Sequence, residues 1–423
     1  MPRSPSLTAR VRDAVTAFYR GSHDFNGLPY TDLVRCVRGP DISVLRAVRA
    51  LVRRGEISAI FGDIHPNAHI RALPDEPIAS QLAKLAADSN ACLYPTEATL
   101  AKVVPADFHA ERPFTRRLAL GEPQLAYAAF DLAVLESYRN DPRYVFDVGD
   151  AGGMISVTDE YYESEGMPKR DQVLLQTFGF CYAPNKRRAV GVFLRYLSGL
   201  SSEHQKIWHA RMLTGDYKMH PDYWASSMGH WPEGASVFEA ILAEMTFINR
   251  MATAMGRGQL FKQDFDDARP LEFAFLLRPT QKDFDTFMQT LDKMLSENID
   301  PAFFRGKVER EVRETRQNGE VVVKPKGSIT MLQEWVGRHF RSKDPAVPAL
   351  FETLKEVRKL RSHPSHALRV NVYDETIFDV QRELVIRVYH ALTTLRLILA
   401  YWPETKGCEV PRILRGQTTI WTM

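Results

Sequence analysis

An apolar stripe near the end of the chain constrains the fold more than any other feature of the sequence. Between Asp374 and Pro403, apolar side chains recur in steps of three and four residues: Ile377, Val380, Leu384, Val388, Ala391, Leu395 and Ile398. This spacing is typical of a helix that turns one face toward a core. Other helices must cover that face, so we expect a helical bundle in this part of the chain.

Earlier segments can supply the partner helices. Three are long and one is shorter: 236–256, 280–298, 346–361 and 328–340. Ser236 followed by Glu239 predicts a capping box at the start of the first, and Thr280 followed by Asp283 predicts a similar start for the second. Four long helices can bury a shared core. We therefore predict a four-helix bundle at 233–402, with a tail at 403–423 that packs back loosely.

Between the last two long helices lies a short basic segment interrupted by a proline. Arg361 and His366 stand five residues apart, with Pro364 between them. On one continuous helix the two side chains would point about 140° apart. A proline cannot extend a helix but suits the first turn of a new one, so we expect a break that brings the two together. A guanidinium and an imidazole beside a helix start form a plausible phosphodiester site.

The hexapeptide RSHPSH, Arg361–His366, resembles the Arg-polar-x-x-x-His motif of HEPN domains. These all-α domains occur in many prokaryotic toxins and defence nucleases. In that family the pair lies at the start of the last long helix of a four-helix bundle. Ser362 stands where the family usually has Asn, Asp or His. The resemblance implies a metal-independent endoribonuclease that acts on an RNA substrate as a homodimer, in anti-phage defence or growth arrest.

The resemblance also implies a role for each residue of the motif. His366 would be the general base that activates a ribose 2′-OH, and Arg361 would stabilise the charge that grows on the phosphoryl oxygens. Arg358, Ser362 and His363 would be supporting groups. No metal or other cofactor is required. The structural alternative is that Arg361 and His366 only join helix ends by hydrogen bonds.

The first 75 residues predict a different kind of domain. Three helical segments precede two short strands at residues 56–73, an order that resembles a winged helix with residues 42–54 in the recognition-helix position. Asp41 is the expected N-cap of that third helix, and Gly55 lies just past its end. We expect its buried stripe to be Ile42, Leu45, Val48 and Val52.

Three arginines fall on the other side of this helix. Arg46, Arg49 and Arg53 are candidates for contact with DNA or RNA, together with the predicted hairpin. The alternative is a solvated basic face on a domain that contacts protein. A regulator that binds DNA through this domain, with a helical C-terminal domain that only dimerises, is the second functional hypothesis for the whole chain.

Residues 76–232 predict an α+β middle region. Its first part, to residue 135, is expected to be mostly helical, and β-branched and aromatic runs from Arg143 to Leu200 predict an antiparallel sheet. The glycine-rich segment 149–153 is predicted to be a turn, and the acidic run 159–166 to be solvated. Four histidines and three tryptophans are expected to pack between domains: His204, His209, His220, His230, Trp208, Trp224 and Trp231.

Composition sets the remaining limits. A chain of 423 residues is expected to form two or three domains, so the fold class we predict is mainly α and multidomain. A net charge of +3 does not itself indicate nucleic-acid binding. The four cysteines have no C-x-x-C spacing, which favours free thiols in a reducing compartment. With no apolar segment that predicts a signal peptide or membrane span, we expect a cytoplasmic location and no membrane partner.

Overall fold

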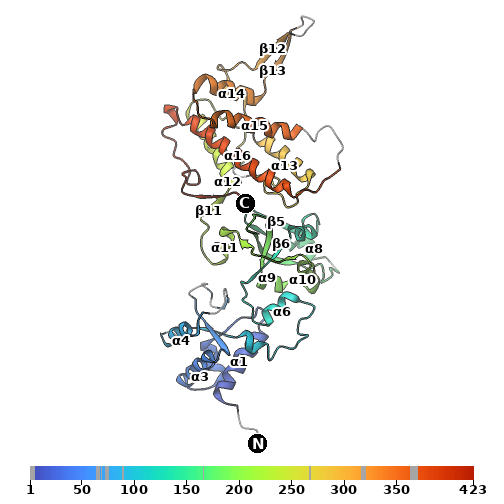
Figure 1. Cartoon of the computed structure of the whole chain (residues 1–423), viewed down its shortest axis with the longest axis vertical. Helices are drawn as coiled ribbons and strands as arrows, with labels where there is room; N and C mark the ends of the chain where they lie inside the picture. The colour runs from blue at the N-terminus through green and yellow to red at the C-terminus, as the bar shows by residue number, and fades with distance from the viewer. Residues whose placement is uncertain are drawn as a thin grey trace. The chain divides into compact units, whose positions relative to one another are not determined.

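The computed structural model divides the chain into two compact units, residues 1–232 and 233–423 (Figure 1). It describes residues 5–62, 67, 69–71, 76–87, 90–164, 166–265, 268–315, 321–362 and 370–423. The fold is a mixture of helices and antiparallel sheet distributed over several domains, rather than plainly mainly α. In the described ranges, no helix is both long enough and apolar enough to cross a membrane.

The first unit begins with three helices packed on a small sheet. The elements are α1 (Leu7–Gly21), β1 (Leu28–Pro29), α2 (Tyr30–Val37), α3 (Asp41–Arg53), β2 (Ile57–Ile60) and β3 (Cys92–Pro95). The three strands are antiparallel in the order β1-β3-β2. Apolar residues from all three helices and the sheet form one buried cluster, which includes Val15, Leu33 and Val48.

The partner of β2 corrects the predicted hairpin. Within the described residues Ile57–Ile60 pairs with Cys92–Pro95, whereas the sequence predicted that both strands of a hairpin lie within residues 56–73. Between the two strands lies α4 (Ile78–Ala87), whose Gln81 accepts a 2.9 Å hydrogen bond from the backbone N–H of Ala59. The sequence was misinterpreted because a turn signal follows β2 at once, whereas the pairing strand lies beyond an inserted helix.

A larger antiparallel sheet follows, in the order β5-β6-β7-β8-β4-β9, with β10 also pairing with β7. Its strands are β4 (Tyr127–Phe130), β5 (Tyr144–Val148), β6 (Gly152–Val157), β7 (Leu174–Tyr182), β8 (Arg188–Phe193), β9 (Met212–Leu213) and β10 (Lys218–Met219). The antiparallel pairing confirms the sheet predicted from residue 143 onward. The segment 127–130, however, was predicted to be helical and is an inner strand, because β8 and β9 both hydrogen-bond to it.

The short helices of this unit are α5 (Glu97–Leu100), α6 (Pro113–Ala119), α7 (Glu136–Arg139), α8 (Asp159–Tyr162), α9 (Leu194–Gly199), α10 (Ser202–His209) and α11 (Pro221–Ser227), with η1 at Leu132–Leu135. The histidines and tryptophans of residues 204–231 were predicted to pack between domains, but they differ in burial. Trp208 and His204 are buried in this unit, whereas His209, His230 and Trp231 are exposed. Acidic Asp159 and Glu160 are exposed as predicted.

The second unit is built on long helices. They are α12 (Val237–Ala254), α13 (Gln281–Met294), α14 (Ser328–His339), α15 (Ala346–Ser362) and α16 (Thr376–Leu399). Helices α12 and α15 both pack on α16, and α13 packs on α15. The capping box of Ser236 and Glu239 is confirmed, and so is the Thr280 cap, whose hydroxyl accepts a hydrogen bond from the backbone N–H of Asp283.

The predicted stripe on α16 is confirmed at every position but one. Val380 is 46% exposed, and its neighbour Gln381 is fully buried instead. The Gln381 amide accepts a 3.0 Å hydrogen bond from the backbone N–H of Leu276 and donates one of 2.9 Å to the carbonyl of Ala274. A polar side chain can occupy the core here because both ends of its amide are satisfied.

The end of the chain is bound more closely than the predicted loose tail. After η4 (Pro403–Thr405) and η5 (Arg412–Leu414), strand β14 (Thr419–Trp421) pairs in parallel with β11 (Gly234–Ser236). Leu414 is buried in the helical core. Elsewhere in this unit, η2 (Pro301–Phe304) precedes the antiparallel pair of β12 (Glu311–Thr315) and β13 (Val321–Pro325), and residues 316–320 between these strands lie outside the described residues.

Candidate functional site

Helix α3 presents a basic face to solvent. Its buried residues are Val44, Ala47, Val48, Leu51 and Val52. The buried face is therefore rotated slightly about the helix axis relative to the predicted stripe. Ile42, predicted to be buried, is 58% exposed. At about 100° per residue, Ile42, Arg46, Arg49 and Arg53 fall within an arc of about 60° on the side opposite the core. Arg46 and Arg53 are exposed and Arg49 is half-buried.

These three arginines lack, in the ranges that the structure describes, the acidic partners that other arginines nearby have. Arg35 forms an ion pair with Asp32, and Arg54 forms one with Glu56. Within the described part of the chain, no carboxylate pairs with Arg46, Arg49 or Arg53, and the Arg49 Nε atom is buried without a hydrogen-bond acceptor. Three positive charges on one exposed face therefore have no acidic residue to balance them, which is the electrostatic requirement for binding a polyanion.

Two contacts hold α3 in place beneath this face. The Tyr30 hydroxyl at the start of α2 donates a 2.6 Å hydrogen bond to the carboxylate of Asp41 at the start of α3. Burial and this hydrogen bond both raise the pKa of Tyr30, so the phenol stays protonated as a donor. Helix α3 begins at Asp41 and its N-cap is Pro40, so the prediction that Asp41 is the N-cap was wrong.

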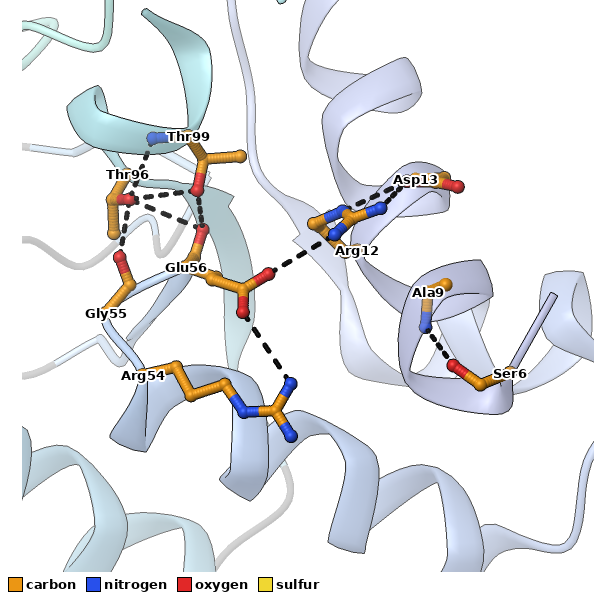
Figure 2. A network of polar contacts seen from close by, with 9 residues as sticks. All are labelled: Ser6, Ala9, Arg12, Asp13, Arg54, Gly55, Glu56, Thr96 and Thr99. Carbon is orange, nitrogen blue, oxygen red and sulfur yellow. Dashed lines mark hydrogen bonds and ion pairs between the residues drawn. The ribbon is translucent and has the colours of Figure 1, made fainter. Parts of the chain in front are cut away.

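At the other end of α3, a glycine stops the helix and a carboxylate ties it to its neighbours. Gly55 has a φ of +65°, as expected of the residue just past a helix end. The Glu56 carboxylate then contacts Arg12 of α1 at 3.5 Å and Arg54 at 3.7 Å, while its carbonyl oxygen accepts a hydrogen bond from Thr99 (Figure 2). Both ends of α3 are thus fixed before any ligand binds.

The predicted catalytic segment is described only in part. Helix α15 ends at Ser362, as the sequence predicts for a helix that stops near Arg361. His363 and His366 lie outside the described residues, and of Ser362 only the backbone is described. Arg358 is exposed on α15. The predicted convergence of Arg361 and His366 is therefore not visible.

Arg361 has acidic partners that sequence reasoning missed. Its Nη1 atom lies 3.0 Å from the carboxylate of Asp292, which is fully buried near the end of α13, and it also pairs with Glu297. The Asp292 carboxylate accepts a further hydrogen bond from Ser296. Asp292 and Glu297 precede Arg361 by more than 60 residues, so no local pattern could have indicated the pairing. A phosphate bound here would compete with two carboxylates for one guanidinium.

The two ends of the segment between α15 and α16 lie at opposite ends of α13. Arg361 contacts Asp292 near the C-terminus of α13, whereas the carbonyl of Val372 accepts a 2.9 Å hydrogen bond from the N–H of Gln281 at its N-terminus. Helical residues 281 and 292 are about 17 Å apart along the axis. Arg361 and Val372 therefore contact opposite ends of α13.

No cluster of three or more His, Cys, Asp or Glu side chains that could hold a metal ion occurs among the described residues. Comparison with protein-family models, curated proteins and solved structures finds no match to this chain.

Proposed function

We propose that this protein binds duplex nucleic acid through the exposed face of α3. The observation that carries the proposal is the set of Arg46, Arg49 and Arg53, which share one face and lack acidic partners among the described residues. In support, the element order α1-β1-α2-α3-β2-α4-β3 and the sheet order β1-β3-β2 resemble those of a winged helix with one inserted helix, and in that fold the third helix enters the major groove. Helix α4 falls between β2 and β3, the position in the sequence at which a winged helix has its wing.

The chemistry of this face suits DNA in two ways. The arginines can neutralise phosphates or donate paired hydrogen bonds to guanine O6 and N7. Exposed Ile42, in the first turn of α3, is the kind of apolar side chain that contacts a thymine methyl group.

Salt-dependent binding tests this proposal. Full-length wild type and an Arg46→Gln/Arg49→Gln/Arg53→Gln variant are titrated onto a fluorescent random-sequence DNA duplex at several NaCl concentrations. For every phosphate that the variant no longer neutralises, the slope of log K against log salt should become shallower by about 0.9. Arg170→Gln removes one exposed arginine elsewhere in the first unit and serves as the control. Equal binding by the triple variant and wild type would refute the proposal.

Metal-independent RNA cleavage by a HEPN-like second unit is the second candidate function. What favours it is the set of four long helices α12, α13, α15 and α16, with the motif Arg361–His366 beginning where α15 ends. Arg361 would have to leave Asp292 and Glu297 to reach a phosphate, which is why we place this function second. In this proposal the protein acts as a homodimer in defence or growth arrest, and the N-terminal domain serves as its sensing part.

Expression in bacteria tests the cleavage proposal. Wild type is expected to slow growth and fragment total RNA, and His366→Ala is expected to do neither while reaching the same protein level. Cleavage by purified protein should persist in EDTA and leave 2′,3′-cyclic phosphate ends. Intact RNA in the wild-type culture, together with DNA binding that depends on α3, would favour the regulator hypothesis, in which the second unit only dimerises.

A further inference from the structure

A pocket of about 470 Å³ lies in the first unit, between α6 and the β4-β9 edge of the large sheet. Helix α6 contributes Arg116 and Arg117, the sheet contributes Tyr127 and Leu213, and His209 lies at the end of α10. This volume is that of a small-molecule site. The described residues that line it include three basic side chains and no acidic one, and the others are apolar residues, a glycine and tyrosines.

The basic groups of the pocket are not equally available. Arg117 is engaged by the Glu122 carboxylate, to which its Nε atom donates a 2.7 Å hydrogen bond. Arg116 donates from Nη1 to the carbonyl of Phe108 at 3.0 Å and has no carboxylate partner in the described part of the chain. The ring nitrogens of His209 also have no hydrogen-bond partner among the described residues, and the ring lies 6.0 Å from that of Phe114. Arg116 and His209 are therefore free to bind an anion.

Hydrogen bonds hold two other parts of the pocket wall in place. The Tyr127 hydroxyl donates a 2.6 Å hydrogen bond to the carbonyl of Tyr217, which fixes its half-buried ring against the pocket. The fully buried Gln205 accepts hydrogen bonds from the N–H groups of Phe114 and Thr115 and so anchors the start of α6. Such a pocket loses little conformational entropy when it binds a ligand.

Helix α6 is also hydrogen-bonded to α1, one of the three helices that precede β2 in the first unit. The buried Tyr19 hydroxyl of α1 donates a 2.6 Å hydrogen bond to the carbonyl of Leu118 in α6. Helix α1 in turn packs on α3. One wall of the pocket is thus continuous with the helices that support Arg46, Arg49 and Arg53.

We propose that this pocket binds a small phosphorylated ligand with a planar ring, of the class of a nucleoside monophosphate, with its phosphate on Arg116 and His209 and its ring against Tyr127. An isolated phosphate would leave the apolar lining residues uncovered, and a neutral nucleoside would leave Arg116 without an anionic partner. Both parts of the ligand are therefore needed for tight binding. This site is distinct from the α3 face, and its occupation does not require that α3 bind nucleic acid.

Calorimetric titration of the full-length protein tests the site. The probes are the four 5′-ribonucleoside monophosphates, the four nucleosides and inorganic phosphate, each added alone. At least one monophosphate is expected to bind about tenfold or more tightly than its nucleoside or than phosphate, because a charge-assisted hydrogen bond contributes at least that factor. Absence of binding by all four monophosphates, or equal affinity for phosphate alone, would overturn the proposal.

Two variants locate the binding. Arg116→Gln and His209→Ala should each weaken the monophosphate about tenfold and leave the weak binding of the nucleoside unchanged. His209 is exposed, so its variant keeps the test valid if Arg116→Gln fails to fold. Arg170→Gln, which lies outside the pocket, should bind as wild type does. Unchanged monophosphate affinity in His209→Ala and a folded Arg116→Gln would refute the assignment.

Discussion

The hydroxyl of Tyr30 and the carboxylate of Asp41 are joined by a 2.6 Å hydrogen bond that links the first residue of α2 to the first residue of α3. The same hydroxyl lies 3.3 Å from the Asp41 carbonyl oxygen. Tyr30 is 3% exposed, so the contact is shielded from water. This bond fixes the angle at which α3 leaves the turn, and with it the direction in which the arginine face points.

Tyr30→Phe should therefore lower the free energy of unfolding by about 1–2 kcal/mol, since it removes one buried hydrogen bond and leaves an Asp41 oxygen without its donor. Urea denaturation followed by circular dichroism measures the change. Tyr162→Phe is the control, because Tyr162 is 58% exposed. If the two variants have equal stability, the hydrogen bond does not hold α3.

Glu56 provides a second test of how α3 is supported (Figure 2). Glu56→Ala should destabilise the protein by about 0.5–1 kcal/mol, because its carboxylate contacts both Arg12 and Arg54 and is only partly exposed. The effect of the substitution should shrink as NaCl is raised from low to molar concentration. The carbonyl contacts with Thr96 and Thr99 are kept in this variant.

Asp13 offers a matched comparison for Glu56, because it also pairs with Arg12 but is 64% exposed. Asp13→Ala should change stability less than Glu56→Ala, since it breaks one exposed pair within α1 and connects no second element. A larger decrease in stability for Asp13→Ala would mean that the link between α1 and α3 contributes little.

Protonation of His204 should make stability depend on pH. Burial lowers the pKa of His204 below 6.5; among the described residues its Nε2 atom has no hydrogen-bond partner, and its Nδ1 atom lies 2.8 Å from the Tyr138 hydroxyl. As the pH falls, the unfolded chain then takes up a proton before the folded one does. The contribution to stability is complete above pH 6.5 and is lost as the pH falls toward the folded pKa.

Thermal unfolding between pH 5 and pH 8 measures this effect. His204→Gln should show a smaller decrease in Tm on acidification than wild type, and His230→Gln, at an exposed position, should follow wild type. Buried His220 also has a pKa lowered by burial, so some dependence on pH remains in both variants. Parallel curves for wild type and His204→Gln would contradict the prediction.

Local signals in the sequence were sufficient for the long helices of the second unit, but not for every short helix or strand pairing of the first. The caps at Ser236 and Thr280 were predictable because each needs only residues three apart. The inner strand at 127–130 was missed because its alanine-rich sequence has helical propensity, and only the hydrogen bonds from β8 and β9 override it. The partner of β2 was missed because it follows the inserted α4.

The candidate sites divide in the same way. The arginine face of α3 follows from spacing along one helix, so it could be predicted although the buried stripe was placed slightly wrongly. The ion pairs of Arg361 could not, because Asp292 and Glu297 come from another helix and the loop after it. The pocket beside α6 could not be predicted either, because Arg116, Tyr127 and His209 come from α6, β4 and α10 and line one pocket only in the folded chain.

Arg361 should have a measurable structural role apart from any chemistry. Arg361→Gln is expected to destabilise the protein by about 1–3 kcal/mol, because it leaves the fully buried Asp292 without a cation. Asp292→Asn in the same chain should restore part of that stability. Arg358→Gln, at an exposed position one turn earlier on α15, is the control and should change stability by less than about 0.5 kcal/mol. Absence of RNA cleavage in Arg361→Gln is therefore informative only beside such a stability measurement.

The last prediction concerns two neighbouring residues of α16: Gln381 faces the core, where the apolar stripe had predicted Val380. Gln381→Leu keeps the volume but leaves the Leu276 N–H and the Ala274 carbonyl without their partners, so it should destabilise the protein by about 2–4 kcal/mol. Val380→Ala should change stability by less than about 0.5 kcal/mol, because Val380 is 46% exposed. A simple apolar stripe predicts the reverse order, with the valine substitution the more damaging. Chemical denaturation of the two variants decides between these alternatives.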